Sequence, residues 1–116
     1  MKTAIVRTLH GNVRVKARRV VLPALPERLF ILHEEPTKST GLKKSWVVSD
    51  ALSGVAVAVQ WYASEGQKDV INKANEALLT RIPEGQSFDQ FVKSYMRTNH
   101  IAPLRSNIQN FSLCTK

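Results

Sequence analysis

The residues that most constrain the fold lie in the middle of the chain, where two runs of strand-forming residues flank a short turn. The runs are Ser45–Asp50 and Val55–Tyr62, and the turn between them reads ALSG. Side chains alternate between the two faces of a strand, and apolar residues fall on one face of both runs: Trp46, Val48, Val55, Val57, Val59 and Trp61. Gly54 closes the turn and is expected in a left-handed conformation. The sequence therefore predicts a β-hairpin with a continuous apolar face.

The segment that follows predicts a long amphipathic helix that covers this face. Ser64 and Gln67 have the spacing of a capping box. Asp69 and Lys73 are four residues apart and are expected to pair along the helix, and Pro83 is expected to end it. The apolar positions recur with helical periodicity: Val70, Ile71, Ala74, Leu78 and Ile82.

A second, shorter helix is predicted from a capping box at Ser87 and Gln90 to a point near Asn99. Its apolar stripe consists of Phe88, Phe91, Val92, Tyr95 and Met96. Such a stripe usually packs into the core. The alternative for the same residues is a partner groove or the contact face of a homodimer.

The N-terminal part predicts another hairpin and one further strand. The hairpin joins Thr3–Leu9 to Asn12–Val21, with Gly11 and Asn12 as its turn. The prolines of LPALP interrupt the sheet, and the strand Arg28–Glu34 follows.

These elements define an α+β fold: an antiparallel sheet of about five strands, made of two hairpins plus one strand, covered by the long helix and accompanied by a short one. We expect a single domain over residues 1–116, because one core commonly serves a chain of this length. Residues 101–116 are expected to form either a docked or a flexible C-terminal arm.

The charge is unevenly distributed along the chain. The net charge is +8, and all the N-terminal cations precede the first acid, Glu27. A positive field attracts nucleic acids, anionic membranes and acidic protein surfaces. The basic strand contributes Arg14, Lys16, Arg18 and Arg19, and a polar loop contributes Lys38, Lys43 and Lys44.

The alternating pattern places Arg14, Lys16 and Arg18 on one side of their strand, and Arg19 departs from it, which predicts a bulge or a strand end there. This row is either a contact surface for an anionic partner or the hydrated face of an ordinary strand. Tyr62 is the candidate exposed aromatic residue, whereas Trp46 and Trp61 are expected in the core.

The sequence contains no motif for a specific reaction. The chain has three histidines, and they lack the spacing of metal ligands: His10, His33 and His100. We therefore expect no metal and no cofactor. The cluster formed by His33, Glu34 and Glu35 is expected to be a solvated strand end. Cys114 is the only cysteine, so no intrachain disulfide can form.

No apolar run reaches the ~20 residues that would cross a bilayer, and the first residues lack the apolar core of a signal peptide. We therefore expect no membrane association and a cytoplasmic location in a bacterial host cell.

The stretch KSWVVSDALSGVAVAVQWYASEGQKDVINKANEALL resembles small β-β-α accessory proteins of phages, plasmids and other mobile elements, a loose class that includes anti-CRISPR inhibitors. The similarity covers about a third of the chain, and Trp46, Ser53 and Gly54 match only as structural positions.

The resemblance implies a mobile-element context. With the charge distribution, it leads us to expect a small basic non-catalytic protein that binds or occludes a macromolecular partner, such as a host-defence nucleoprotein. One alternative is a direct DNA- or RNA-binding accessory factor. A second is a small enzyme with a dispersed active site.

Overall fold

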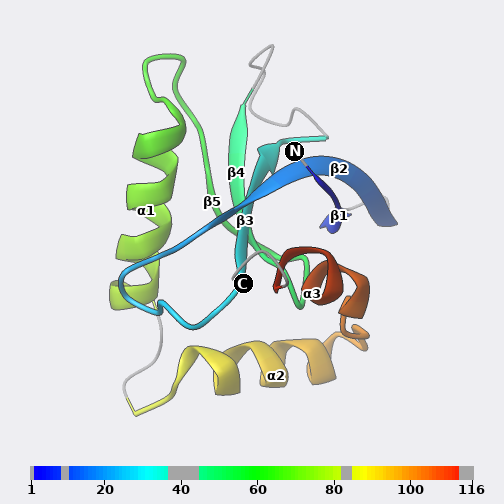
Figure 1. The fold of residues 1–116 in the computed structure, drawn as a ribbon. Helices are drawn as coiled ribbons and strands as arrows, with labels where there is room; N and C mark the ends of the chain where they lie inside the picture. The colour runs from blue at the N-terminus through cyan, green and yellow to red at the C-terminus, as the bar shows by residue number, and fades with distance from the viewer. Residues whose placement is uncertain (1, 9–10, 37–44, 82–84, 113–116) are drawn as a thin grey trace.

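The computed structural model describes residues 2–8, 11–36, 45–81 and 85–112. They form a five-stranded antiparallel sheet followed by three helices (Figure 1). The strands are β1 (Lys2–Thr8), β2 (Gly11–Val20), β3 (Phe30–Glu34), β4 (Trp46–Asp50) and β5 (Ala56–Val59), and the helices are α1 (Gln67–Thr80), α2 (Phe88–Thr98) and α3 (Arg105–Ser112). Each strand pairs with the next in the chain, so β1 and β5 are the sheet edges. The predicted α+β fold is confirmed.

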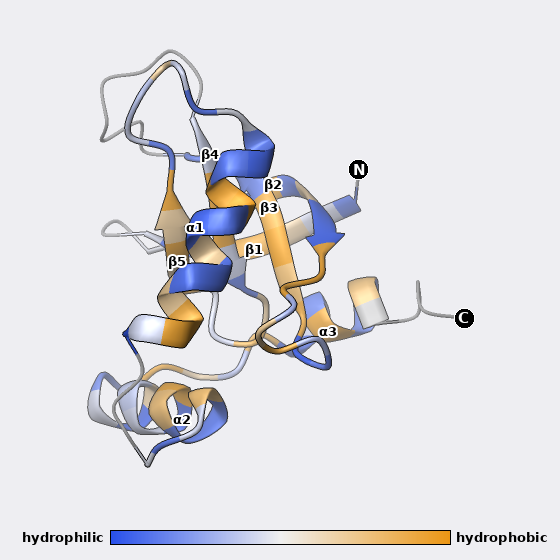
Figure 2. Ribbon diagram, turned by 90° about the vertical axis from the view of Figure 1, so that its left-hand side faces the viewer, coloured by the Kyte–Doolittle hydropathy of each residue, from blue (hydrophilic) through white to orange (hydrophobic). Residues whose placement is uncertain are grey.

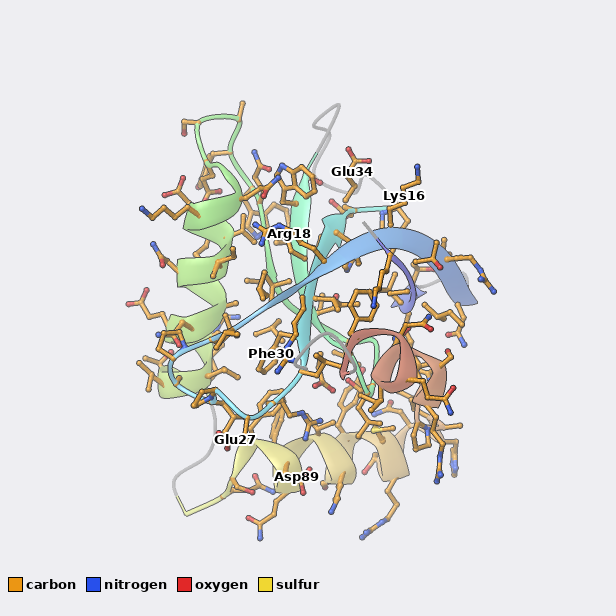
Figure 3. The ribbon with its side chains drawn as sticks, viewed as in Figure 1. Lys16, Arg18, Glu27, Phe30, Glu34 and Asp89 are labelled. Carbon is orange, nitrogen blue, oxygen red and sulfur yellow. The ribbon has the colours of Figure 1, made fainter. Side chains whose placement is uncertain are left out.

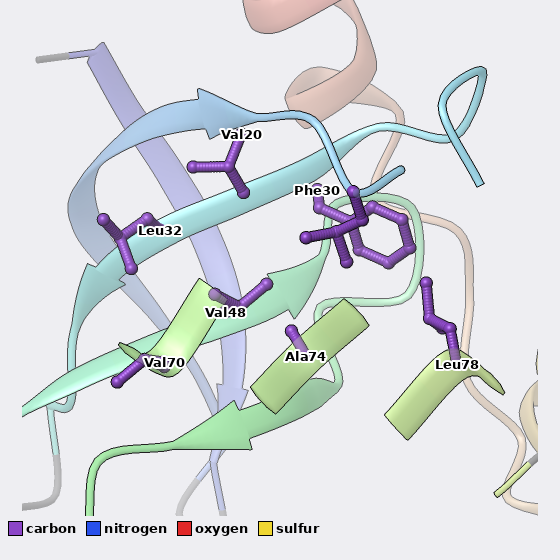
Figure 4. Packing of buried hydrophobic residues seen from close by; sticks show 8 residues of the cluster. Val20, Phe30, Leu32, Val48, Val70, Ala74 and Leu78 are labelled. Carbon is purple, nitrogen blue, oxygen red and sulfur yellow. The ribbon is translucent and has the colours of Figure 1, made fainter. Parts of the chain in front are cut away.

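The helix α1 covers one face of the sheet, which we call the α1 face. Pairing of Arg18 with Leu32 and of Leu32 with Val48 places these side chains on that face. A cluster of buried side chains from the strands, the segment after β2 and α1 fills the space between them (Figure 4): Val20, Leu22, Phe30, Leu32, Val48, Val70, Ala74 and Leu78. Figure 2 shows α1 in front of β3 and β5, whose residues are largely hydrophobic.

The opposite face, which we call the α3 face, packs against α3. Its cluster consists of Ala4, Val6, Ala17, Leu29, Ile31, Ala51 and Phe111. The sheet is therefore covered on both faces, which the sequence did not predict. The C-terminal segment that could have been a docked or a flexible arm forms α3 over residues 105–112 and docks on β1.

The first hairpin differs from its prediction in two places. Thr8 pairs with Gly11 and Arg7 with Asn12, so Gly11 and Asn12 already belong to β2 and the predicted turn is wrong. The residues between Thr8 and Gly11 lie outside the described part of the chain. Of the two alternatives expected near Arg18 and Arg19, the bulge is wrong, because β2 pairs regularly with β3, whereas the strand end lies close by, at Val20.

The break in alternation has a simple physical reason. Ala17 packs in the α3-face cluster and Val20 in the α1-face cluster. Both faces of β2 are thus buried near its end, so apolar residues appear on both sides of the strand without an inserted residue.

The helix starts are partly as predicted. The capping box of α2 is confirmed: Ser87 N–H donates to Gln90 Oε1 over 3.0 Å, and Gln90 N–H donates to Ser87 Oγ over 3.1 Å. The predicted box at Ser64 is wrong, since α1 starts after Gly66, whose N–H donates to Asp69 over 2.8 Å. Lys73 pairs with Glu65 at 2.7 Å and not with Asp69, so the expected helical pair is wrong.

An ion pair holds α2 at one end of the sheet, and Figure 3 labels its α2 member, Asp89. Arg28 contacts the buried carboxylate of Asp50 and the exposed one of Asp89, each at 2.8 Å. Its guanidinium lies 5.0 Å from the centre of the Phe88 ring. The apolar stripe of α2 is only partly in the core, because Val92 and Met96 are buried whereas Phe91 and Tyr95 remain partly exposed.

Candidate functional site: a cation row on β2

The exposed cations of β2 form the candidate site, and we call Arg14, Lys16 and Arg18 the cation row. All three side chains are exposed and lie on the α1 face of the sheet, where Arg14 pairs with Ile5 and Lys16 with Thr3. Alternate residues of a strand are about 6.6 Å apart, so the row extends over about 13 Å. Figure 3 shows Lys16 and Arg18 on β2.

The cation row differs from the other N-terminal cations in its contacts. Arg7 Nε donates to Ser53 O over 2.7 Å, and its Nη2 donates to Ala102 O, so this guanidinium holds two loops to β1. Within the described part of the chain, Arg14 and Lys16 make no ion pair. Their charges are therefore available to a partner.

Arg18 connects the row to the start of α1. Its Nη2 donates to Gln67 Oε1 over 3.0 Å, and Gln67 is the first residue of the helix. An acidic residue of β3, Glu34, lies beside the cation row. Ala17 pairs with His33, so Glu34 and Lys16 lie at the same end of the paired strands β2 and β3 (Figure 3). Sequence reasoning did not place Glu34 beside the cation row, because its approach depends on the β2–β3 register.

The other predicted cations are not part of this row. Arg19 lies on the α3 face, where it pairs with Ile31 and is half-buried. Its Nε is enclosed and has no hydrogen-bond partner among residues the structure describes. Lys38, Lys43 and Lys44 lie outside the described residues.

Two exposed aromatic side chains precede α1. Tyr62 is 69% exposed, in agreement with its predicted place, but Trp61 is 58% exposed and the prediction of a core position is wrong. The reason is that β5 ends at Val59 and the chain turns: the N–H groups of Trp61 and Tyr62 both donate to Glu65 Oε1 over 3.0 Å. Lys73 hydrogen-bonds Glu65 and thereby lowers the pKa of this carboxyl group. The aromatic residues and Arg18 thus flank the same end of α1.

A buried polar pair lies on the α3 face. His33 Nε2 is 2.8 Å from Ser49 Oγ, and His33 Nδ1 is 2.7 Å from Glu34 O. Because a carbonyl only accepts, Nδ1 carries the proton and Nε2 accepts from the hydroxyl group. Burial lowers the pKa of His33, which favours the neutral ring. The sequence-based expectation of a solvated strand end is wrong for His33, which is 2% exposed.

The same pair has the contacts of a nucleophile and a base, and it borders an open groove of about 540 Å³ that Glu35 also lines. Ser49 is only 1% exposed, however, and each partner satisfies a buried polar atom of the other. This burial favours a structural role. Within the described residues, no group of three or more histidine, cysteine or acidic side chains could hold a metal ion.

Comparison of the chain with protein-family models, with curated proteins and with solved structures gave no match. What the structure defines directly is a meander sheet covered on both faces by helices. No helix in the described ranges is long and apolar enough to span a bilayer.

Proposed function

We propose that the protein is a small non-catalytic binding protein that holds or occludes an anionic macromolecular partner through the cation row. The observation that carries this proposal is the exposure of Arg14, Lys16 and Arg18 along one face of β2, where Arg14 and Lys16 form no ion pair with a described residue. Exposed charges that form no ion pair with a described residue can pair across an interface, where they raise the association rate and orient the partner.

The partner proposed is an acidic protein or nucleoprotein surface, such as a host-defence nucleoprotein bound by an anti-CRISPR-like inhibitor of a phage or mobile element. The exposed rings of Trp61 and Tyr62 support a protein surface, because aromatic residues beside cations are typical of the energetically important part of an interface. Arg18 is hydrogen-bonded to Gln67 at the start of α1, the end of the helix that these two aromatic residues precede.

A capture experiment from the bacterial host tests this proposal. The tagged protein and its Arg14→Glu/Lys16→Glu variant are compared with Arg97→Glu/Arg105→Glu, which changes the net charge equally on exposed positions of α2 and α3. The proposal predicts a defined complex that the first variant loses and the second retains. Retention of the complex by the β2 variant would show that the cation row is not the interface.

Direct binding of nucleic acid is the second candidate, and the spacing of the row favours it. Alternate strand residues are about 6.6 Å apart, close to two phosphate steps of about 3.4 Å along one nucleic-acid strand. Three phosphate contacts would give a slope of about −2.7 for log K against log salt, so a fourfold rise in salt would weaken binding about 40-fold. A gel-shift titration measures this slope, and absence of a complex at low salt excludes the candidate.

A further inference from the structure

A cavity of about 260 Å³ lies between the C-terminal end of α1, the helix α2 and the hairpin of β4 and β5. Figures 1 and 2 show α2 crossing this end of α1. The first turn of α2 is fixed to the end of the sheet, because the rings of Phe88 and Phe30 lie 5.6 Å apart and Asp89 pairs with Arg28. The following turns of α2 line the cavity with three side chains: Phe91, Val92 and Tyr95.

The lining of this cavity is largely apolar and partly aromatic. Its inner wall includes Ala77, Leu78 and Val92, each less than a tenth exposed. Phe91 is 38% exposed and Tyr95 is 42% exposed, so these two rings lie at the open side. Phe88 adds a third ring, and aromatic rings pack favourably against another ring in an offset or edge-to-face arrangement. The lining therefore favours an aromatic ligand over an aliphatic one.

Two charged residues border the cavity, and they differ in their contacts. The Asp50 carboxylate accepts from Arg28 Nε over 2.8 Å and from Ser53 Oγ over 2.7 Å, so its charge is paired inside the fold. Arg81 follows the last turn of α1, is exposed, and makes no ion pair with any residue in the described ranges. A bound anion can therefore pair with Arg81, whereas a bound cation meets no unpaired carboxylate among the described residues of the lining.

The volume of the cavity limits the size of the ligand. An apolar cavity of about 150 Å³ holds one benzene molecule, and pockets for drug-sized ligands begin at about 300 Å³. At about 260 Å³ the cavity lies between these two sizes, which suits a body of about two fused rings. Such a body would make the dispersion contacts that the lining side chains lack toward an empty space.

We propose that this cavity binds a small aromatic carboxylate, with its rings between α1 and α2 and its carboxylate on the guanidinium of Arg81. Packing against the apolar and aromatic lining supplies most of the affinity, and hydrogen bonds from the guanidinium to the carboxylate fix the orientation of the ligand. An apolar pocket with few polar contact points is the usual form of a small-molecule site. This proposal does not depend on the cation row, since no residue of β2 lines the cavity within the described part of the chain.

The test uses 2-naphthoate, titrated into the protein labelled with ¹³C at its methyl groups. The methyl signals of Leu78 and Val92 are expected to shift and to reach saturation, because these side chains lie in the inner wall. Arg81→Gln should weaken binding of 2-naphthoate about fivefold, the usual effect of losing one exposed charge pair. Arg97→Gln removes an exposed cation from the last turn of α2, outside the lining, and should bind like the wild type.

Two further ligands separate the effect of the charge from that of the rings. Naphthalene-2-carboxamide has the same rings without the charge, so it should bind more weakly than 2-naphthoate and should bind the wild type and Arg81→Gln with equal affinity. Decanoate has the charge without the rings and should also bind more weakly. Ala77→Leu fills part of the inner wall and should abolish binding of 2-naphthoate.

If Ala77→Leu does not fold, the comparison of 2-naphthoate with its amide still decides the result. The proposal is overturned if the Leu78 and Val92 signals do not move, if Arg81→Gln binds 2-naphthoate as tightly as the wild type, or if the amide or decanoate binds as tightly as 2-naphthoate. It is also overturned if Arg14→Glu/Lys16→Glu loses the binding, which would place the anion on the cation row.

Discussion

The side chain of Asn107 offers a quantitative test of how α3 is held to the sheet. It is fully buried, with 0% exposed. Its Oδ1 accepts from Ile5 N–H over 2.8 Å, and its Nδ2 donates to Ile5 O over 2.7 Å and to Ala51 O over 2.9 Å. Asn107→Ala removes three hydrogen bonds and leaves one backbone donor and two backbone acceptors without their partners.

The expected cost follows from these three groups. An unsatisfied buried group costs about 1–3 kcal/mol. The contacts to Ile5 are only partly buried, so water can reach that backbone in the variant and the lower end of this range applies. We expect the free energy of unfolding to fall by about 3 kcal/mol, a large part of the about 5–15 kcal/mol that holds a small domain together.

Urea unfolding followed by circular dichroism measures this loss. Asn110→Ala is the matched control, because Asn110 lies on the exposed side of α3 and its amide donates to Thr3 O over a longer 3.3 Å. The control should change the free energy of unfolding by less than about 1 kcal/mol. If the free energy of unfolding of Asn107→Ala lies within about 0.5 kcal/mol of the wild-type value, the role given to this amide is refuted.

Three further predictions concern the core and its turns. Because burial lowers the pKa of His33 in the folded state, the unfolded chain takes up a proton first, and the free energy of unfolding should decrease below pH about 6.5, by at most about 1.4 kcal/mol per pH unit. His33→Gln should remove this dependence in urea titrations between pH 5 and 8. Asp50→Ala leaves Arg28 without its buried counterion and should cost about 3–5 kcal/mol in thermal or urea unfolding. Gly54 has φ of +73°, and an added Cβ would lie 2.6 Å from Leu104 Cδ1, so Gly54→Ala should destabilise by about 1–3 kcal/mol in the same assay.

The sheet and the first two helices could be predicted because their signals are local. Alternation and helical periodicity identify the strands, α1 and α2 without any knowledge of long-range contacts. The third helix could not be identified in this way. The buried residues are Leu104, just before the helix, and Asn107 and Phe111 within it. The asparagine interrupts the apolar periodicity because it binds the edge of β1 rather than packing as a hydrophobic residue.

The cation row was predictable for the same reason, since alternation along one strand is enough to place Arg14, Lys16 and Arg18 on one side. The residues next to the cation row could not be predicted in this way. Glu34 approaches through the pairing of two strands, and Trp61 is exposed because β5 ends two residues before it. Both facts depend on registers and strand ends, which sequence patterns define least well.

The most direct test of the proposed function is a ¹⁵N NMR titration of the protein with polyglutamate, which represents an acidic protein surface. If the cation row is the contact surface, the largest shift changes occur at Arg14, Lys16 and Arg18, and they diminish as salt is added because salt screens exposed charges. Changes spread evenly over all exposed cations, or concentrated on α2 and α3, would contradict the assignment of this surface to β2.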